Sequence, residues 1–174
     1  MKRVVLIGFM GSGKSTLGKK LAKKLDIPFI DSDAEIEKHH SKSIGEIFAD
    51  NGESFFREIE AKFIDSLKDE SSFVLSTGGG MPCFGSNLEK LKSLGLTLYL
   101  ERSPKELAHR LHNAKQQRPL IAGLSKDELV DFIEDKLVLR EEFYKQADVI
   151  LDREEQTPAA IQQLLHHLQP LQKS

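Results

Sequence analysis

A glycine-rich segment near the amino terminus carries the clearest chemical pattern in the chain. Residues 8–16 read Gly-Phe-Met-Gly-Ser-Gly-Lys-Ser-Thr, after the apolar run 4–7 and before a helical pattern. This is the spacing of a phosphate-binding P-loop, in which glycines allow backbone N–H groups to turn inward around phosphate oxygens. We therefore predict a nucleoside triphosphate site here, and not an ordinary glycine-rich turn. The expected contacts are Gly11, Ser12, Gly13, Lys14, Ser15 and Thr16.

Three side chains of this segment have separate expected roles. Lys14 reaches the β and γ phosphates, and the Ser15 hydroxyl ligates Mg²⁺. Thr16 begins a helix whose amino-terminal dipole faces the anion. Because phosphoryl transfer depends on positioning and on neutralising charge, Lys14 is a candidate catalytic residue.

Two carboxylates follow the second apolar segment, residues 28–30. In an open parallel sheet, ligands lie outside the carboxyl ends of the strands, so Asp31 and Asp33 should share an edge with the P-loop. Asp31 is the candidate for the Mg²⁺ shell. Asp33 is a candidate to accept the proton of a substrate hydroxyl or to orient that hydroxyl. Spacing alone explains Asp33 equally well as the N-cap of a helix that starts at Ala34.

Three consecutive glycines follow the third apolar segment. Gly78, Gly79 and Gly80 remove every side chain from this part of the edge, which permits close approach of a ligand and offers free backbone donors. A flexible loop is the alternative. Beside a P-loop, we interpret the three glycines as candidate substrate contacts.

Arginines are the candidate ligands for an anionic substrate. Arg140 continues the apolar helical face of Ile133, Leu137 and Tyr144, where an arginine is rarely buried without an anionic partner. The planar guanidinium group of Arg140 can bind both oxygens of a carboxylate. Arg57 has acidic residues one turn away on either side, a pattern that surface ion pairing also explains. Arg118 lies in a loop from which it could reach the transferring phosphate, or it is a solvated loop charge.

Apolar segments that alternate with helix-length intervals predict the elements that position these residues. The intervening segments repeat leucine, isoleucine and phenylalanine at helical spacing, so the pattern predicts an α/β fold with a parallel sheet. Residues 113–124 lack this periodicity and predict a mobile loop between two helices. The strand-like segments are residues 4–7, 28–30, 73–75, 96–100 and 149–151.

Composition limits the other classes of protein. The chain has 174 residues, a formal net charge of −2 and one cysteine, Cys83. The length suits a single domain over residues 1–174, and the charge balance indicates neither a nucleic-acid nor a membrane surface. A single cysteine excludes an internal disulfide and suits a reducing compartment, and no apolar run reaches the roughly 18 residues of a membrane span. We therefore expect a cytoplasmic protein, and a monomer because no surplus apolar helix face is evident.

These motifs, in this order, resemble those of the shikimate kinase family along nearly the whole chain. The resemblance implies a nucleoside-monophosphate-kinase-like fold of three α/β/α layers, with a five-stranded parallel sheet of order 2-3-1-4-5. It also implies Mg²⁺- and ATP-dependent phosphorylation of the 3-hydroxyl of shikimate, on the route to chorismate and the aromatic amino acids. The stretches that carry it are residues 8–16, 29–33, 47–60, 78–80 and 118–120, and the pair Arg140 and Tyr144.

The same resemblance implies roles for particular residues. It implies that Arg118 is a lid residue that meets ATP, within a mobile lid at about 113–124, and that Arg110 and the neighbourhood of Pro158 flank adenine. A helical region at about 33–61 would bind the substrate. Whether Asp33 removes the hydroxyl proton or only orients the hydroxyl stays open. The implied shikimate contacts are Asp33, Arg57, Gly79, Gly80 and Arg140.

The residues are also compatible with two other functions. An arginine pair does not specify which acid it binds, so a kinase for gluconate or for a nucleoside monophosphate is one alternative. A nucleotide-binding regulator without turnover is the other. The sequence contains no Asn-Lys-x-Asp or Thr-Lys-x-Asp element for guanine recognition, which weighs against a GTP switch.

Overall fold

Five parallel strands form one sheet in the order β2-β3-β1-β4-β5. The computed structural model describes residues 2–113, 121 and 123–168. The predicted strand order is confirmed, and the predicted segments agree with the strands to within about one residue at each end. The strands are β1 (Arg3–Ile7), β2 (Phe29–Asp31), β3 (Phe73–Ser76), β4 (Leu96–Leu100) and β5 (Val149–Leu151).

The central strand β1 is buried on both faces. Val4 pairs with Val74 of β3 on one side and with Leu96 of β4 on the other. Val4 and Leu6 belong to the core on one face of the sheet, and Val5 and Ile7 to the core on the opposite face. A continuous branched apolar run is what a strand between two helical layers requires, because neither face meets water.

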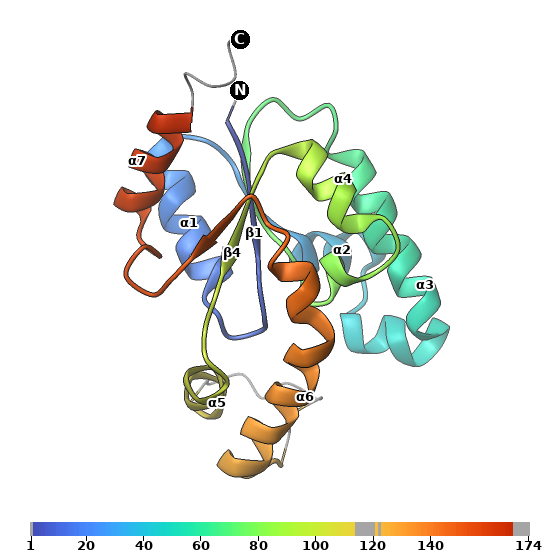
Figure 1. The fold of residues 1–174 in the computed structure, drawn as a ribbon. Coiled ribbons are helices and arrows are strands. Elements are labelled where there is room, and N and C mark those ends of the chain that lie inside the picture. Colours follow the sequence, from blue (N-terminus) through green and yellow to red (C-terminus); the bar gives the residue numbers. More distant parts are fainter. Residues whose placement is uncertain (1, 114–120, 122, 169–174) are drawn as a thin grey trace.

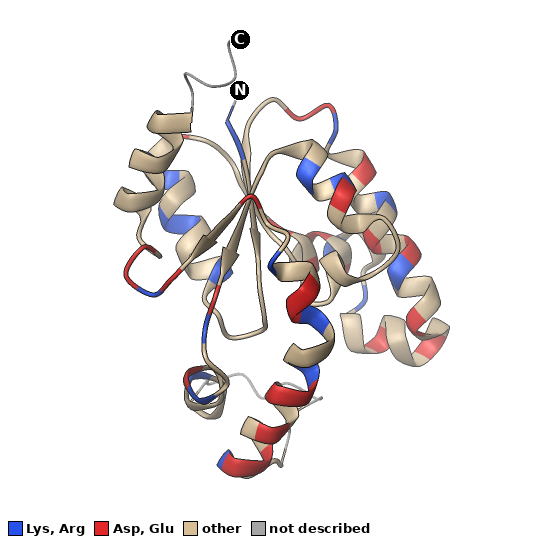
Figure 2. Cartoon of the chain, in the orientation of Figure 1, with Lys and Arg blue, Asp and Glu red and all other residues tan. Residues whose placement is uncertain are grey.

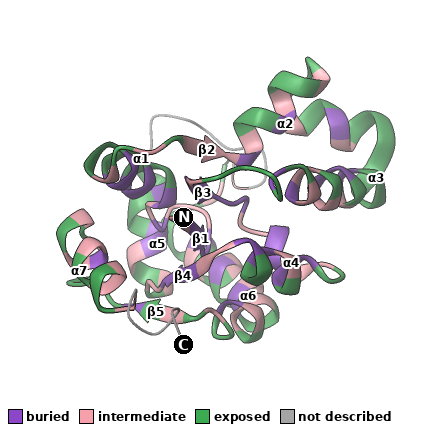
Figure 3. Ribbon diagram, turned by 90° about the horizontal axis from the view of Figure 1, so that it is seen from above, coloured by how far each residue is buried: buried purple, intermediate pink, exposed green. Residues whose placement is uncertain are grey.

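Helices cover both faces of the sheet and complete the predicted three layers (Figure 1). On one face lie α1 (Lys14–Leu25) and α7 (Pro158–Leu168). On the other face lie α3 (Ile44–Ser66), α4 (Asn87–Leu94) and α6 (Lys126–Tyr144), and α5 (Pro104–His112) packs against α6. Viewed from above, the buried residues concentrate on the strands and on the helix faces turned toward them (Figure 3).

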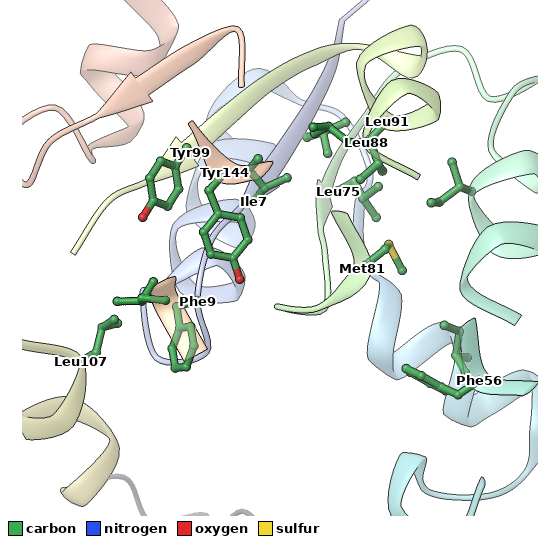
Figure 4. Packing of buried hydrophobic residues seen from close by; sticks show 14 of the residues in the cluster. Ile7, Phe9, Phe56, Leu75, Met81, Leu88, Leu91, Tyr99, Leu107 and Tyr144 are labelled. Carbon is green, nitrogen blue, oxygen red and sulfur yellow. The ribbon is translucent and has the colours of Figure 1, made fainter. Parts of the chain in front are cut away.

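The larger core fills the space between the sheet and the α3, α4 and α6 layer. Ile7 and Leu75 from the sheet lie near Leu88 and Leu91 of α4, and the rings of Tyr99 and Tyr144 are 5.1 Å apart (Figure 4). Tyr144 is therefore a core residue at the end of α6. Its burial fixes the last turns of α6, which carry Arg140, against the sheet.

Helix α2 (Ser32–His40) and the first part of α3 lie beyond the β2 edge of the sheet (Figure 3). Ser43 caps α3 through a reciprocal pair of hydrogen bonds with Glu46. Gly52 breaks α3 at φ 80° and ψ 175°, a conformation almost restricted to glycine, so the first turns of α3 leave the axis of the rest. The predicted substrate-binding region 33–61 corresponds to α2 and most of α3.

The carboxyl ends of the strands meet at the lower edge of the sheet in Figure 1. Lysine and arginine are mixed with aspartate and glutamate on α3 and α6 (Figure 2). No helix in the described ranges is both long and apolar enough to cross a lipid bilayer. Most of the predicted lid at 113–124 lies outside the described residues.

Candidate active site

The P-loop connects β1 to α1 and turns against α5. Gly13, the N-cap of α1, has φ 105°, and a Cβ atom there would lie 3.1 Å from Nη2 of Arg110. A Cβ atom on Gly11 would lie 2.9 Å from Cγ of Leu111. Glycine is needed at both positions, because each combines a positive φ with a close neighbour.

Lys14 is the first residue of α1, so the helix begins two residues before the predicted start at Thr16. The side chain is buried, and Nζ donates hydrogen bonds to the carbonyl oxygens of Gly8 at 2.7 Å and Phe9 at 2.9 Å. The ammonium group therefore lies within the loop itself. An anion in the loop would meet this charge together with the amino terminus of α1.

Hydroxyl and carboxylate groups from three elements meet beside the start of α1. The Ser15 hydroxyl donates to Oδ2 of Asp31 at 2.7 Å, and Oγ of Ser15 lies 3.2 Å from Oγ of Ser76. Asp31 is also the N-cap of α2, because its Oδ1 accepts from the backbone N–H of Ala34. These hard oxygen atoms are the ligand type that Mg²⁺ prefers.

Asp33 lies in the first turn of α2, so the alternative prediction that it caps a helix starting at Ala34 is wrong. The extended backbone ends at Asp31, which takes the capping position two residues earlier. Oδ1 of Asp33 accepts from the Ser32 hydroxyl at 3.2 Å, and Ser32 Oγ accepts from the Gly78 N–H at 2.8 Å. A Cβ atom on Gly78 would approach Oδ1 of Asp33 to 2.6 Å, so a larger residue there would displace this carboxylate.

One cleft of about 280 Å³ opens at this edge and joins most of the predicted site residues. It receives residues from the P-loop, from the ends of β2 and β3, and from α5. The cleft is lined by Met10, Gly11, Gly13, Lys14, Ser15, Thr16, Asp31, Asp33, Ser76, Thr77, Gly79, Arg110 and Leu111.

Arg57 lies beside Gly80, which directly follows the cleft residue Gly79. Its guanidinium forms ion pairs with Glu60 at 2.7 Å and with Glu53 at 2.8 Å, and its Cζ lies 3.7 Å from the centre of the Phe84 ring. A Cβ atom on Gly80 would lie 3.1 Å from both Nη1 and Nη2 of Arg57. The expected ion pairs of Arg57 are present, and one of them is buried, because Glu60 is only 1% exposed.

Arg140 reaches the same edge from α6. A Cβ atom on Gly79 would lie 3.6 Å from Nη1 of Arg140, and Cζ of Arg140 lies 5.5 Å from the centre of the Phe9 ring in the P-loop. The Tyr144 hydroxyl donates to the carbonyl oxygen of Gly79, which fixes the glycine segment to α6. No carboxylate in the described ranges forms an ion pair with Arg140, so its guanidinium can take an anionic ligand.

Burial alters the titration of two groups around the arginines. Burial raises the pKa of the Glu60 carboxyl above its ordinary value, against the opposing effect of Arg57. Burial also raises the pKa of the Cys83 thiol to about 11, although Arg140 and Arg57 act in the opposite direction. Cys83 therefore stays a protonated thiol near neutral pH, packed against the core, and does not supply a nucleophile.

A second cleft of about 270 Å³ lies on the other side of Gly13. Arg110 lines both clefts, so the two adjoin each other at the P-loop. Pro158, at the start of α7, lines only the second cleft. The structure thus brings Arg110 and Pro158 together, whereas Arg118 lies outside the described residues. The lining residues are Ser12, Gly13, Thr16, Leu17, Lys20, Leu100, Arg102, Arg110, Gln156, Thr157 and Pro158.

Two neighbours of the site are not among the residues singled out from the sequence. Ser76 takes the place at the end of β3 where a metal-directed aspartate is common, and a hydroxyl at such a position is a usable signal. Phe84 contacts Arg57 from a separate loop, and no local pattern of spacing connects the two residues.

The comparisons with known proteins indicate the same family along nearly the whole chain. The sequence profile described as Shikimate kinase matches residues 10–169. A shikimate kinase from Bacteroides fragilis is 46% identical over 169 residues, which is 94% of each chain.

Solved structures show the same relationship. The structure of a shikimate kinase from Bacteroides thetaiotaomicron is similar with a TM-score of 0.88 and 42% identity, over 97% of this chain and 98% of that one. A shikimate kinase from Acinetobacter baumannii, solved in complex with shikimate, gives a TM-score of 0.83 and 30% identity, over 99% of this chain and 95% of that one. The chain therefore belongs to the shikimate kinase family.

Proposed function

We propose that the cleft at the carboxyl edge of the sheet brings ATP and shikimate together for phosphoryl transfer. Family membership makes the chain an ATP-dependent kinase that phosphorylates the 3-hydroxyl of shikimate, in the biosynthesis of aromatic amino acids. The proposal concerns which residues carry out each part of that reaction. A single observation carries it: Lys14, Asp33 and Gly79 line one cleft, Arg140 lies beside Gly79, and Arg57 lies beside Gly80, the next residue.

The P-loop binds the phosphates in this proposal. Backbone N–H groups of residues 11–16 face the phosphate oxygens, and Lys14 exchanges its contacts with the carbonyls of Gly8 and Phe9 for contacts with the transferring phosphate. The charge of Lys14 then stabilises the transition state, in which negative charge lies on the phosphoryl oxygens. Arg118 is proposed as a second cation that meets ATP.

The arginines bind the shikimate carboxylate, and Asp33 meets the reacting hydroxyl. Planar guanidinium groups match the two oxygens of a carboxylate, and Arg57 and Arg140 approach Gly80 and Gly79. Glycines at 78, 79 and 80 leave space for the ring beside the Asp33 carboxylate. From that position, Asp33 accepts a hydrogen bond from the 3-hydroxyl and turns its oxygen toward the phosphate.

Ser15 and Asp31 fit a magnesium ion. The Ser15 hydroxyl donates a hydrogen bond to Asp31, so a lone pair of Ser15 Oγ can face the ion. Magnesium would supply neutralisation of phosphate charge when bound. Within the described ranges, no three histidine, cysteine, aspartate or glutamate side chains gather as a metal cluster. The remaining ligands in this proposal are therefore nucleotide oxygens and water.

The second cleft takes the nucleoside end of ATP in this proposal. Arg110 lines both clefts and Pro158 lines the second, so a base between them would connect directly to phosphates in the P-loop. We also propose a monomer acting in the cytoplasm as a single domain. The lone cysteine, kept as a protonated thiol, is compatible with a reducing compartment.

A substrate-panel assay tests the choice of acid. ADP release is measured with shikimate, gluconate and a nucleoside monophosphate as acceptors, each with and without Mg²⁺. We expect turnover with shikimate, dependent on Mg²⁺, and at most trace turnover with the others. A preference for gluconate would show that the arginines serve another acid. ATP binding without phosphoryl transfer to any of the three acceptors would favour the alternative of a nucleotide-binding regulator without turnover.

A further inference from the structure

The contacts around Arg57 leave two of its N–H groups for a ligand. A guanidinium has five N–H donors. Nε and Nη2 each donate to Oε1 of Glu53, at 3.2 and 2.8 Å, and Nη1 donates to Oε2 of Glu60 at 2.7 Å. Within the described part of the chain, one N–H on Nη1 and one on Nη2 therefore remain unused.

Gly80 shows where these two N–H groups can be reached. A Cβ atom on Gly80 would lie at the same distance, 3.1 Å, from Nη1 and Nη2, and farther from Cζ, at 3.4 Å. A side chain at this position would therefore crowd the two terminal nitrogens, whereas glycine leaves the approach to them open. A carboxylate that enters beside Gly80 can meet both N–H groups, as in bidentate pairing.

The two acidic partners do not by themselves fix the direction of this pair of N–H groups. Both contact the guanidinium from its edges, so it can still pivot about the line that joins them. Phe84 blocks that motion, because Cζ of Arg57 lies only 3.7 Å from the ring centre, a van der Waals contact. The rings of Phe56 and Phe48 are farther from Cζ, at 5.4 and 6.0 Å.

We propose that Phe84 is a positioning residue for substrate binding, which fixes the plane of the Arg57 guanidinium through a cation–π contact. The two free N–H groups then stay directed toward the substrate carboxylate before it arrives. This inference rests on the proposed role of Arg57 in binding shikimate. A cation that is already ordered loses less conformational freedom when the ligand binds, so the benefit appears in shikimate affinity.

Fluorination of the ring tests the cation–π contact without changing its shape appreciably. Phe84 is replaced by phenylalanine with successively more ring fluorines, which weakens and then reverses the negative potential of the ring face. We expect KM for shikimate to rise with each step, by about three- to tenfold at full fluorination. KM for ATP and kcat should stay within about twofold. Phe84→Leu should resemble the fluorinated ring, and Phe84→Tyr should resemble the unchanged enzyme.

Phe132 provides the matched control. It is a half-buried phenylalanine on α6 with Nζ of Lys136 at 5.8 Å from its ring centre, and it has no part in the proposed site. Fluorination of Phe132 should leave KM for shikimate unchanged. Melting temperatures of all variants separate a loss of folding from a loss of affinity.

Arg57→Ala separates this inference from the proposed function. A higher KM for shikimate in Arg57→Ala, together with a graded rise across the Phe84 series, supports both. A higher KM in Arg57→Ala with a flat Phe84 series overturns the role of Phe84 and leaves that of Arg57 intact. An unchanged KM in Arg57→Ala overturns the proposed role of Arg57, and the role of Phe84 with it.

Discussion

Individual side chains in the cleft are oriented by neighbours that do not themselves meet the substrates. Ser15 contacts Asp31, and Arg57 contacts Glu53 and Glu60. Preorganised charges of this kind accelerate a reaction because little reorganisation remains at the transition state. Changes to single residues should therefore affect catalysis and binding separately.

Replacing Lys14 by alanine should affect the chemical step. We expect Lys14→Ala to lower kcat by about 10²- to 10³-fold, the usual effect of removing a preorganised charge stabiliser. The Kd for shikimate, measured by calorimetry, should change little because the proposed contacts of Lys14 are with the phosphates of ATP. Near-normal turnover in this variant would remove Lys14 from the mechanism.

Gly80→Ala tests the space in front of Arg57. The backbone of Gly80, at φ −87° and ψ −18°, is acceptable for alanine, so the added Cβ acts only through its contact with Nη1 and Nη2 at 3.1 Å. We expect KM for shikimate to rise about tenfold or more, with an almost unchanged melting temperature.

Gly45→Ala is the control for that experiment. Gly45 lies in α3, and the nearest atom to its added Cβ is 3.9 Å away. Gly45→Ala should leave KM for shikimate unchanged. Equal effects of the two substitutions would show that Gly80 has no special relation to the substrate.

Helices and strands were predictable where the apolar pattern is long and regular. The residues Val4 to Ile7 predict a strand, which the structure buries on both faces, and the strand order followed from the family resemblance. The break at Gly52 was not predicted, because an isolated glycine in a helical pattern is usually tolerated.

Site residues were predictable to the extent that each motif is local in sequence. The P-loop and the three glycines could be recognised from consecutive residues, and the meeting of the P-loop with Gly79 in one cleft follows from parallel strands. The capping prediction for Asp33 failed because both Asp31 and Asp33 are good caps, and the extent of β2 decided between them. The contact of Phe84 with Arg57 depends on tertiary packing, which spacing does not encode.

The burial of Glu60 on α3 makes the stability of the protein depend on pH. Burial raises the pKa of Glu60 in the folded protein, so the folded state binds this proton more tightly than the unfolded state does. The contribution of Glu60 to the free energy of unfolding is complete below the pKa that Glu60 has in the unfolded state. It is lost as pH rises through the higher pKa that Glu60 has in the folded state.

Glu60→Gln removes this titration. We expect the melting temperature of the unchanged protein, relative to Glu60→Gln, to be higher at about pH 5 than at about pH 8. Calorimetric melts of both proteins across that interval measure the difference. A constant or reversed difference would contradict the raised pKa.

The molecule as a whole should unfold as one unit if residues 1–174 form a single domain. The two apolar cores share the central sheet, since β1 contributes alternate residues to each. Heating should give a single cooperative transition. Mg-ATP at about 100 times its Kd should raise the unfolding free energy by about 2.7 kcal/mol, or the melting temperature by roughly 5–10 °C.

Scanning calorimetry measures this transition. Two separated transitions, of which ATP shifts only one, would show that the layers are independent. Size-exclusion chromatography at the same protein concentration tests the expected monomer of 19.6 kDa.

The central position of β1 has a consequence for how the protein is made. Of the five strands, β1 is synthesised before the others, but its neighbours in the sheet are β3 and β4, which end at Ser76 and Leu100. A nascent chain that ends before β3 contains the whole P-loop sequence, but its β1 has no partner strand on either side. Because β1 pairs only with such distant residues, ATP cannot stabilise the early nascent chain. The apolar strand β1 must therefore avoid aggregation until β4 has emerged.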